Sequence, residues 1–319
     1  MHRWTDPTAT PDGLRPCVAT LGNFDGVHRG HKAVLGALLE VGRQRGLPTV
    51  AVTFDPHPVA VLRPEQAPTL VAPGRLREDL LAQTGIDGLL VMDFTPELAA
   101  QPPEVFVRQV FLRGLQATVL VVGADTRFGV RNSGDVSTLR GMGDQLGFEV
   151  IVLDDLGDGE RYSSTMIRRL LAEGDVADAG RILGRPHRVV GEVVHGNHRG
   201  KALGYPTANL GPDSVGLVPA EGVYAGWLTR TSLPEDAFDR TMPAAISIGT
   251  NPTFTTNDRR TVEAYVLDRD DLDLYGEEVM VEFTAHIRPT LKFDSIDELL
   301  EAMASDVARC HTLLTTIVP

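Results

Sequence analysis

The stretch CVATLGNFDGVHRGHKAVLGALLEVGRQRG, residues 17–46, decides how the first half of this chain folds. Residues 17–22 are mostly apolar and end at a glycine, which predicts a short buried strand. From Gly30 to Arg45 the apolar residues recur at helical spacing, and Gly46 follows as a typical helix end. The stretch therefore predicts a strand, a glycine-containing loop and a helix in direct succession.

The same alternation of strand and helix continues to about Gly184. Short β-rich runs predict four further strands, near residues 49–54, 88–93, 118–123 and 148–153, with amphipathic segments between them. Such alternation is typical of a Rossmann-like α/β domain with a parallel sheet. We therefore expect a doubly wound sheet in the N-terminal half.

The C-terminal half has a different periodicity. After a short expected helix at residues 175–183, strand-like runs predict an all-β domain. Helical spacing returns only at residues 294–316, which predicts one C-terminal helix packed on that domain. Gly184 and Pro186 interrupt the chain, so we expect domains at residues 1–185 and 186–319. The strands are expected near residues 188–194, 223–229, 244–249, 262–267 and 279–287.

Composition narrows the class of protein. The chain has 319 residues, 42% of them hydrophobic, which is enough for two packed cores. Its formal net charge of −13 argues against nonspecific binding to nucleic acid, which depends on Lys and Arg. It has no apolar run of membrane-spanning length, no secretory pattern, and only Cys17 and Cys310 as cysteines. We therefore expect a cytoplasmic protein with reduced thiols and no membrane association.

The loop GNFDGVHRGH, residues 22–31, has the features of an anion site. Its glycines permit close approach of a ligand, and the first amides of the following helix are unpaired donors. His28 and His31 are three residues apart, so both rings can lie on one helical face and donate to phosphate oxygens. Surface histidines beside a helix start are the alternative. Zinc is disfavoured, since the loop has no HExxH glutamate and no nearby cysteine.

Three other unusual segments also follow predicted strands. They are FDPHP at 54–58, GADTRFG at 123–129 and SSTMIR at 163–168. Ligands of open α/β sheets bind beyond the carboxyl ends of the strands, so these segments are expected at one site. Ser164 or Thr165 could cap a helix that carries Arg168, although a plain cap with a solvated arginine remains the alternative.

In the C-terminal half, Thr207 and Asn209 could present oxygen atoms on one face of a strand to a hard cation. Glu263 lies in an otherwise apolar run and could accept a proton from a hydroxyl. The alternatives are a capped turn for the first pair and the solvated face of a strand for the glutamate.

The N-terminal motifs closely resemble the HxGH loop of nucleotidyltransferases and, together, the adenylyltransferase module of bacterial bifunctional FAD synthetases. The resemblance implies that His28 and His31 stabilise the ATP phosphates and that Ser164, Thr165 and Arg168 hold the triphosphate. The family usually has an aromatic residue at the position of Thr126. This departure from the family pattern bears on the affinity for flavin. Further residues expected to bind nucleotide or flavin are Gly22, Asn23, Phe24, Asp25, Gly26, Asp125 and Phe128.

The C-terminal motifs LGRP, GKALGYPTAN, EGVYA, SIGTNPTF, VEAYVLD, LYG and RPTLKF resemble, in this order, those of riboflavin kinase. The resemblance implies a six-stranded antiparallel barrel, with Thr207 and Asn209 around Mg²⁺ and ATP. It also implies Glu263 as the base for the riboflavin 5′-hydroxyl. The other residues expected to bind nucleotide or flavin are Gly196, Gly200, Lys201, Pro206 and Asn251.

The two resemblances together imply an enzyme that phosphorylates riboflavin to FMN and adenylylates FMN to FAD, using ATP with Mg²⁺. Its expected partners are ATP, riboflavin, FMN and FAD, not nucleic acid or membrane, and we expect a monomer or weak homo-oligomer. One alternative is a different HxGH nucleotidyltransferase with a regulatory β-domain. A class I tRNA synthetase fragment is less compatible with the acidic chain. A flavin-binding module without turnover is the non-enzymatic alternative.

Overall fold

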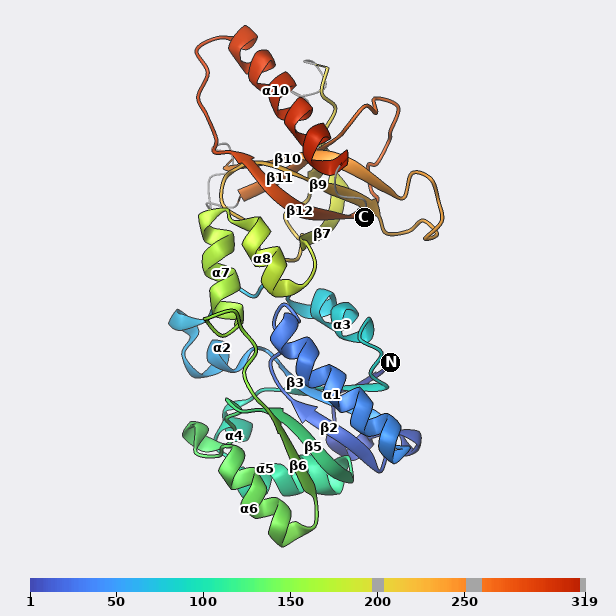
Figure 1. Cartoon of the computed structure of the whole chain (residues 1–319), viewed down its shortest axis with the longest axis vertical. Coiled ribbons are helices and arrows are strands. Elements are labelled where there is room, and N and C mark those ends of the chain that lie inside the picture. The colour runs from blue at the N-terminus through green and yellow to red at the C-terminus, as the bar shows by residue number, and fades with distance from the viewer. Residues whose placement is uncertain (197–203, 251–259, 316–319) are drawn as a thin grey trace. The chain divides into compact units, whose positions relative to one another are not determined.

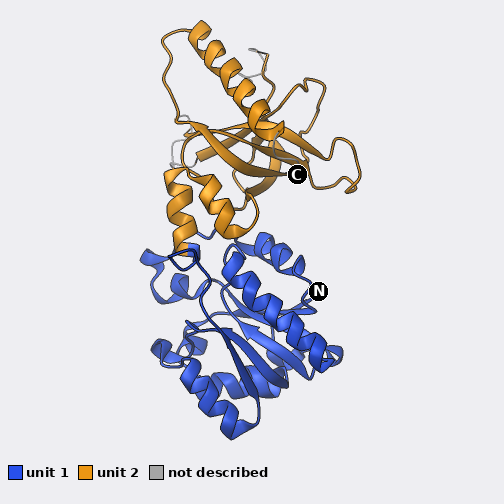
Figure 2. Ribbon diagram, in the orientation of Figure 1, with its two compact units in different colours: residues 1–164 blue, residues 165–319 orange. Residues whose placement is uncertain are grey.

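The computed structural model of the chain describes residues 1–196, 204–250 and 260–315. Packing divides the chain into two compact units, Met1–Ser164 and Thr165–Pro319 (Figure 2). Each unit has its own sheet and its own core. Three residues expected at the second site lie outside the described residues: Gly200, Lys201 and Asn251.

The first unit is built on a six-stranded parallel sheet with the order β1-β4-β3-β2-β5-β6 (Figure 1). The five strands expected from the sequence are present, and the predicted parallel α/β domain is confirmed. The short edge strand β1 was not predicted, because its three residues are mostly exposed and show no alternation. The strands are β1 His2–Trp4, β2 Cys17–Leu21, β3 Thr49–Asp55, β4 Gly88–Asp93, β5 Ala117–Gly123 and β6 Glu149–Leu153.

Helices cover both faces of this sheet. On one face, alternate strand residues pack with Phe106, Phe111 and Leu139 in one apolar core. On the other face lies α1, and a Cβ at its Gly42 would come within 2.4 Å of Thr49 Cγ2, so helix and sheet are in close contact. The helices are α1 Arg29–Arg45, α2 Pro58–Leu62, α3 Gly74–Ala82, α4 Pro96–Ala99, α5 Pro103–Phe106, the π-helix η4 Val107–Gly114 and α6 Val136–Leu146, with 3₁₀ turns at Pro7–Ala9, Asp12–Leu14, Pro64–Gln66 and Val130–Asn132.

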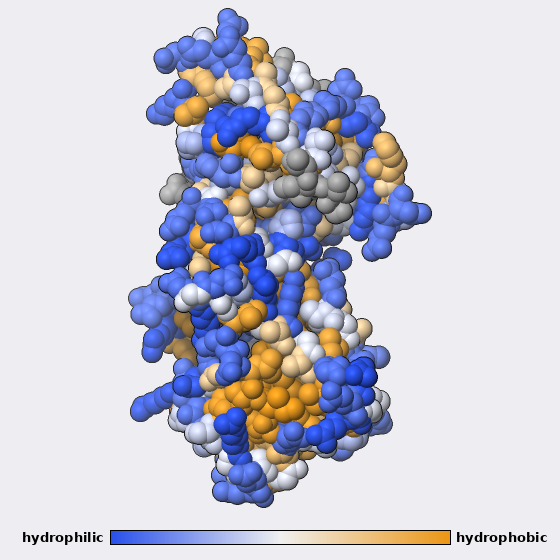
Figure 3. All heavy atoms as spheres, in the orientation of Figure 1, coloured by the Kyte–Doolittle hydropathy of each residue, from blue (hydrophilic) through white to orange (hydrophobic). Residues whose placement is uncertain are grey.

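The visible face of the first unit has an apolar area over β5 and β6 (Figure 3). Strand β6 is an edge of the sheet, and its residues 150–153 are only half-buried. This edge is therefore less completely covered by helices than the central strands, which are buried along most of their length.

The second unit contains a closed barrel with the order β10-β11-β8-β7-β12-β9, in which all neighbours are antiparallel. The predicted six-stranded antiparallel barrel is confirmed. Strand β8 was not predicted because it has only three residues. The strands are β7 His187–Val194, β8 Ala208–Leu210, β9 Gly222–Arg230, β10 Thr241–Thr250, β11 Arg260–Val266 and β12 Glu278–Arg288.

The expected C-terminal helix is α10, Ile296–Thr315, and it packs on β9, β10 and β12. A largely buried ion pair, Arg288 Nη2 to Asp306 Oδ2 at 2.7 Å, joins it to β12. Cys310 is on the buried face of α10 and Cys17 is buried in the first unit, both as free thiols. Burial raises the pKa of each thiol to about 12, so both stay protonated near neutral pH.

Two helices precede the barrel in the second unit, α7 Ser164–Glu173 and α8 Val176–Leu183. Helix α8 packs on β7 and β12, and the amide of Ala220 donates to the carbonyl of Leu171 at 2.9 Å. Packing thus separates the units about twenty residues before the boundary expected at Arg185. Where the functional domains separate stays a prediction.

Candidate active sites

The loop from Gly22 to His31, here called the glycine loop, leads from β2 into α1 through a strained backbone. The φ angles of Phe24, Gly26 and Val27 are +51°, +78° and +42°, all in the left-handed region. For a non-glycine residue this conformation costs about 1–3 kcal/mol and persists only where the surroundings enforce it. Phe24 and Val27 are 2% and 1% exposed, so packing holds both in place. The loop is therefore pre-organised.

Asp25 connects the glycine loop to two other segments. Its buried carboxylate accepts the amides of Val71 at 3.1 Å and Ala72 at 3.0 Å, just before α3. Its carbonyl oxygen accepts the hydroxyl of Ser164 at 2.9 Å. These hydrogen bonds of Asp25 fix the conformation of the glycine loop. The structure brings Ser164 to the loop from the start of α7.

The two histidines stand together at the start of α1. His28 Nδ1 accepts the amide of His31 at 3.3 Å and so caps the helix. Because Nδ1 is the acceptor in this bond, Nε2 is the ring nitrogen that can donate to a ligand. The two rings stack with their centroids 3.7 Å apart and an angle of 20°. The expected placement on one helical face is thus what the structure has.

His31 is held neutral. Burial, followed by the charges of His28 and Arg161, lowers its pKa well below the usual 6.5. Its Nδ1 is buried and has no hydrogen-bond partner in the described part of the chain. A buried polar atom without a partner is uncommon and often indicates an absent ligand or water. This atom therefore favours a ligand site at the start of α1.

Arg161 was not identified from the sequence. Its guanidinium pairs with the carboxylate of Asp125, and its Nε lies 3.3 Å from Asp155 Oδ1. It is also close enough to lower the pKa of His31. A single arginine in a loop has no periodicity, so only its place two residues before SSTMIR could have drawn attention to it. The structure thus places a cation beside the predicted residue Asp125.

Phe128, expected near the flavin, packs inside the protein. Its side chain is 6% exposed and its ring centroid lies 6.2 Å from that of Phe106. A Cβ at Gly134 would come within 2.8 Å of the Phe128 ring, so the bridge between these residues depends on glycine. Phe128 is part of the core, and its contact with flavin stays a prediction.

Helix α7 begins at Ser164, so the cap position falls on Ser163 instead of the expected Ser164 or Thr165. The Ser164 hydroxyl donates to the carbonyl of Asp25 in the glycine loop. Thr165 and Arg168 follow in the first two turns of the helix, in the second unit.

In the barrel, Thr207, Asn209 and Glu263, here called the barrel triad, are brought together by strand pairing. Asn209 on β8 stands directly opposite Glu263 on β11. Asn209 Nδ2 donates to the carbonyl oxygen of Thr207 at 3.1 Å and to its Oγ1 at 3.2 Å. The Thr207 hydroxyl in turn hydrogen-bonds Glu263. The three side chains form one continuous hydrogen-bonded chain that ends at the carboxylate.

The environment of Glu263 favours its use as a base. Burial raises the pKa of its carboxyl above 4.5, and the Thr207 hydrogen bond partly opposes that shift. A carboxylate with a raised pKa takes up a proton more readily than an ordinary glutamate does. The triad can therefore accept a proton from a hydroxyl bound beside it.

Residues around the barrel triad leave little spare space. A Cβ at Gly196 would lie 2.4 Å from Asn209 Oδ1, so only glycine lets the end of β7 come this close. Pro206 is half-buried directly before Thr207. The rings of Tyr205 and Tyr265 meet edge to face at 5.2 Å, a contact that the sequence did not predict.

The barrel triad has the donor types that Mg²⁺ prefers. Hydroxyl and amide oxygens are hard ligands, and Mg²⁺ usually combines one or two protein oxygens with waters and substrate phosphates. Asn209 uses its nitrogen to bind Thr207, which leaves its Oδ1 turned toward Gly196. Over the described ranges, no cluster of three or more His, Cys, Asp or Glu could hold a metal by itself. A shared site with nucleotide phosphates thus fits these residues.

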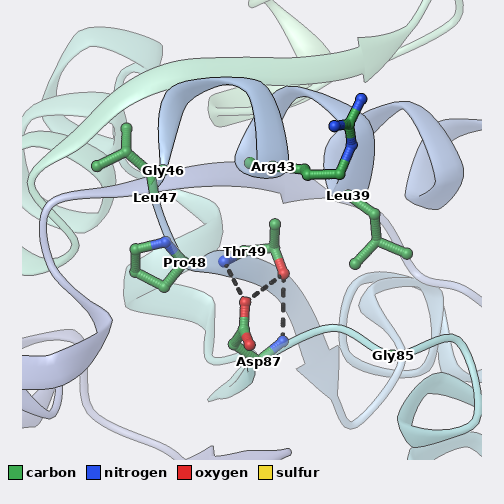
Figure 4. Close-up of a pocket in the computed structure, with 9 residues that line it drawn as sticks. Leu39, Arg43, Gly46, Leu47, Pro48, Thr49, Gly85 and Asp87 are labelled. Atoms are coloured by element: carbon green, nitrogen blue, oxygen red, sulfur yellow. Dashed lines mark hydrogen bonds between the residues drawn. The ribbon is translucent and has the colours of Figure 1, made fainter.

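A shallow hollow lies at the amino ends of β3 and β4, at the edge of the sheet opposite the glycine loop (Figure 4). Asp87 Oδ2 accepts both the amide and the hydroxyl of Thr49 there, each at 2.8 Å. These bonds join the starts of two strands. The polar groups of this hollow are thus occupied in holding the sheet together.

Comparisons with known proteins identify the family of the chain. The family model described as FAD synthetase matches residues 10–166, and the one described as riboflavin kinase matches residues 183–314. The Escherichia coli K12 bifunctional riboflavin kinase/FMN adenylyltransferase is 37% identical over 293 residues, or 91% of this chain and 90% of that protein. The chain belongs to the bifunctional riboflavin kinase/FMN adenylyltransferase family.

Other relatives extend the match along the chain. The bifunctional riboflavin kinase/FMN adenylyltransferase of Listeria monocytogenes is 34% identical, over 91% of this chain and 90% of that protein. A crystal structure described as a macrolide-efflux protein from Streptococcus pneumoniae is 31% identical, with a TM-score of 0.83 over 95% of this chain and 96% of that one. Within the described ranges, this family member has no helix that is both long and apolar enough to span a bilayer.

Membership of this bifunctional family confirms the predicted enzyme class. The chain is an ATP-using enzyme with riboflavin kinase and FMN adenylyltransferase activities. The FAD synthetase match contains the glycine loop, and the riboflavin kinase match contains the barrel triad.

Proposed function

We propose that the two activities reside in separate sites, with FMN adenylylated at the glycine loop and riboflavin phosphorylated at the barrel triad. One observation carries the proposal. Each site contains an ionisable side chain whose environment suits its reaction: hydrogen-bond donors to phosphate in the loop and a proton acceptor in the barrel. In the loop this is the stacked pair His28 and His31, and in the barrel it is Glu263.

At the glycine loop, a phosphate oxygen of FMN attacks the α-phosphorus of ATP, and pyrophosphate leaves. The protein supplies no nucleophile, because positioning and charge stabilisation dominate this class of transfer. His28, with its proton on Nε2, and the neutral His31 donate hydrogen bonds to the phosphates. The first amides of α1 add to the binding of the anion. Ser164, Thr165 and Arg168 hold the triphosphate, as the resemblance implies.

At the barrel triad, Glu263 accepts the proton of the riboflavin 5′-hydroxyl while the hydroxyl oxygen attacks the γ-phosphorus of ATP. The phosphoryl group is transferred and ADP leaves. Thr207 orients the carboxylate through its hydrogen bond, and Asn209 orients Thr207. The chain of bonds thus aims the base before substrate arrives.

The oxygens of Thr207 and Asn209 would hold Mg²⁺ together with the phosphates of ATP. When bound there, the ion would neutralise charge on the phosphates. Support comes from the oxygen donor types at this site, the Thr207 hydroxyl and the Asn209 amide.

The remaining assignments are proposed with these. The functional boundary lies near Arg185, just inside the riboflavin kinase match, which begins at residue 183; residues 167–182 belong to neither family match. The enzyme works in the cytoplasm as a monomer or weak homo-oligomer, and its two buried free thiols suit a reducing compartment. The proposed nucleotide and flavin contacts are Gly22, Asn23, Phe24, Asp25, Gly26, Asp125, Phe128, Gly196, Gly200, Lys201, Pro206 and Asn251.

A time course with riboflavin, Mg²⁺ and ATP tests the proposal. Chromatography should show riboflavin converted first to FMN and then to FAD, with pyrophosphate released only in the second step. Unchanged riboflavin alongside conversion of supplied FMN would mean that the barrel only regulates. Tight flavin binding without ATP consumption would mean that the protein stores flavin.

A further inference from the structure

Arg77 is an unusual residue in the first unit because it is charged and almost wholly buried. It lies on α3 and is 1% exposed, and it is the largest of the fully buried side chains in the described structure. Removing a guanidinium from water is unfavourable unless the protein supplies compensating contacts. The contacts that compensate for the burial of Arg77 must therefore come from other segments than α3.

The Arg77 guanidinium hydrogen-bonds the glycine loop. Arg77 Nη1 donates to the backbone carbonyl of Asn23 at 3.3 Å. The hydroxyl of Thr53, a fully buried residue of β3, donates to the same oxygen at 3.3 Å. This carbonyl directly precedes Phe24, the first residue of the loop with a left-handed backbone. Two buried side chains thus hold the carbonyl at the entrance of the strained turn.

The segment before α3 holds the other side of the same turn. The amides of Val71 and Ala72 bind the carboxylate of Asp25, which directly follows Phe24. The positive charge of Arg77 interacts favourably with Asp25 and with Asp55, and these interactions oppose the lowering of the Arg77 pKa by burial. Helix α3 and the residues leading into it therefore hold the loop before and after Phe24.

Stabilising the core does not by itself explain an arginine at position 77. Its Nε is buried and has no hydrogen-bond partner within the described ranges. An apolar side chain of similar size would fill this space without leaving a donor unsatisfied, and such replacements are often neutral or stabilising. An apolar residue could provide neither the hydrogen bond to Asn23 nor the favourable charge interactions with Asp25 and Asp55.

We infer that Arg77 is a positioning residue for adenylyl transfer: its guanidinium fixes the Asn23 carbonyl and, with it, the left-handed turn that directs His28 and His31 toward the nucleotide. This inference rests on the proposed adenylylation at the glycine loop. Arg77 touches no substrate, and its effect reaches the reaction only through the loop.

The test measures both activities of the full-length enzyme. In Arg77→Met, the kcat for FAD formation from supplied FMN should fall about 10²-fold, as for a misplacement of about 1 Å, with little change in KM for ATP. Arg77→Lys, which keeps the charge and one donor, should recover part of the rate. FMN formation by the same preparation should be unchanged, which shows that the second unit is folded, and the retained KM for ATP in FAD formation shows that the first unit is folded. Arg75→Met, on the same helix and 76% exposed, is the matched control and should be neutral.

A second variant keeps the test decisive if Arg77→Met does not fold. Thr53→Val removes the other donor to the Asn23 carbonyl and should also lower kcat for FAD formation, by about tenfold. Because both groups act on one oxygen, the combined effects of Thr53→Val and Arg77→Lys should be non-additive.

Two results would overturn the inference. One is an unchanged kcat for FAD formation in both Arg77→Lys and Thr53→Val, and the other is an equal loss of both activities in these variants. His28→Ala, measured in parallel, separates this failure from failure of the proposed function. If FAD formation is lost in His28→Ala but not in the Arg77 and Thr53 variants, only the role of Arg77 is rejected. If His28→Ala forms FAD normally, the proposed adenylylation site itself is rejected.

Discussion

The glycine loop is shaped by backbone conformation, whereas the barrel triad is shaped by strand register. In the loop, Phe24 and Val27 adopt left-handed angles, and packing and hydrogen bonds from distant segments hold them there. In the barrel, Asn209 and Glu263 face each other because β8 and β11 pair in that register. A loop of this kind depends on contacts from distant segments of the chain, whereas a site on paired strands forms when the sheet forms.

The two sites also hold their ionisable groups differently. Burial lowers the pKa of His31 and keeps the ring neutral, which suits a hydrogen-bond donor to phosphate. Burial raises the pKa of Glu263, which suits a proton acceptor. The same physical cause acts with opposite sign on a cationic and an anionic acid. The difference predicts that each site can be disabled alone.

The largest expected effect is that of Glu263→Gln on FMN formation. Loss of the base should lower kcat for riboflavin phosphorylation by about 10²–10⁴-fold, because proton removal contributes about that much to catalysis. Conversion of supplied FMN to FAD should be unchanged. Chromatography of the flavins measures both rates, and Glu301→Gln, an exposed position on α10, is the control. Unchanged kinase turnover would remove Glu263 from its role.

The next effect is that of His28→Ala on FAD formation. Loss of one well-placed donor typically lowers the rate about 10²–10³-fold. FMN formation should be intact, because the barrel triad does not depend on the loop. His2→Ala, at an exposed position in the same unit, should behave like the unmodified protein. An equal loss of both activities in His28→Ala would contradict the separation of the two sites.

A smaller effect concerns the pH dependence of the kinase. Glu263 must be ionised to accept a proton, so kcat should fall as the pH drops through its raised pKa, somewhere above pH 4.5. The Thr207 hydrogen bond lowers that pKa, so Thr207→Val should move the acid limb of the profile to higher pH. A limb that stays in place, or moves to lower pH, would argue against the hydrogen bond between Thr207 and Glu263.

The smallest expected effect is on stability. Because the folded pKa of His31 lies below its unfolded value of about 6.5, its stabilising contribution is complete above that pH and is lost as the pH falls below it. The free energy of unfolding should therefore be lower at pH 5.5 than at pH 7.5. Urea unfolding at pH 7.5 and 5.5 measures it, and His31→Gln should show a flatter dependence. The same slope in both proteins would exclude a buried neutral His31.

Most of the secondary structure could be predicted, because apolar periodicity is a local property. The central strands of the sheet and the long helices α1 and α10 were expected close to where they occur. Strands β1 and β8 were missed because three residues are too few to show alternation. The hydrogen bond from Ser164 to the carbonyl of Asp25 could not be predicted, because these two residues lie far apart in the chain.

For the site residues too, those that belong to a local pattern could be predicted, and those that depend on distant segments could not. His28 and His31 could be paired from the sequence because they are one helical turn apart. Arg77 and Arg161 could not be found, because an isolated arginine gives no pattern and their partners lie in distant segments. Phe128 was expected near the flavin, and only packing revealed that its ring is enclosed by the core.

The sequence by itself determined the order of strands and helices, the change from a parallel sheet to a barrel, and the motifs that mark the two activities. These properties follow from short-range periodicity and from residue types at fixed spacing. Only the tertiary structure decided that Glu263 faces Asn209, that His31 is neutral, and that α3 holds the glycine loop. Register, burial and hydrogen bonding between distant segments exist only once the chain has folded.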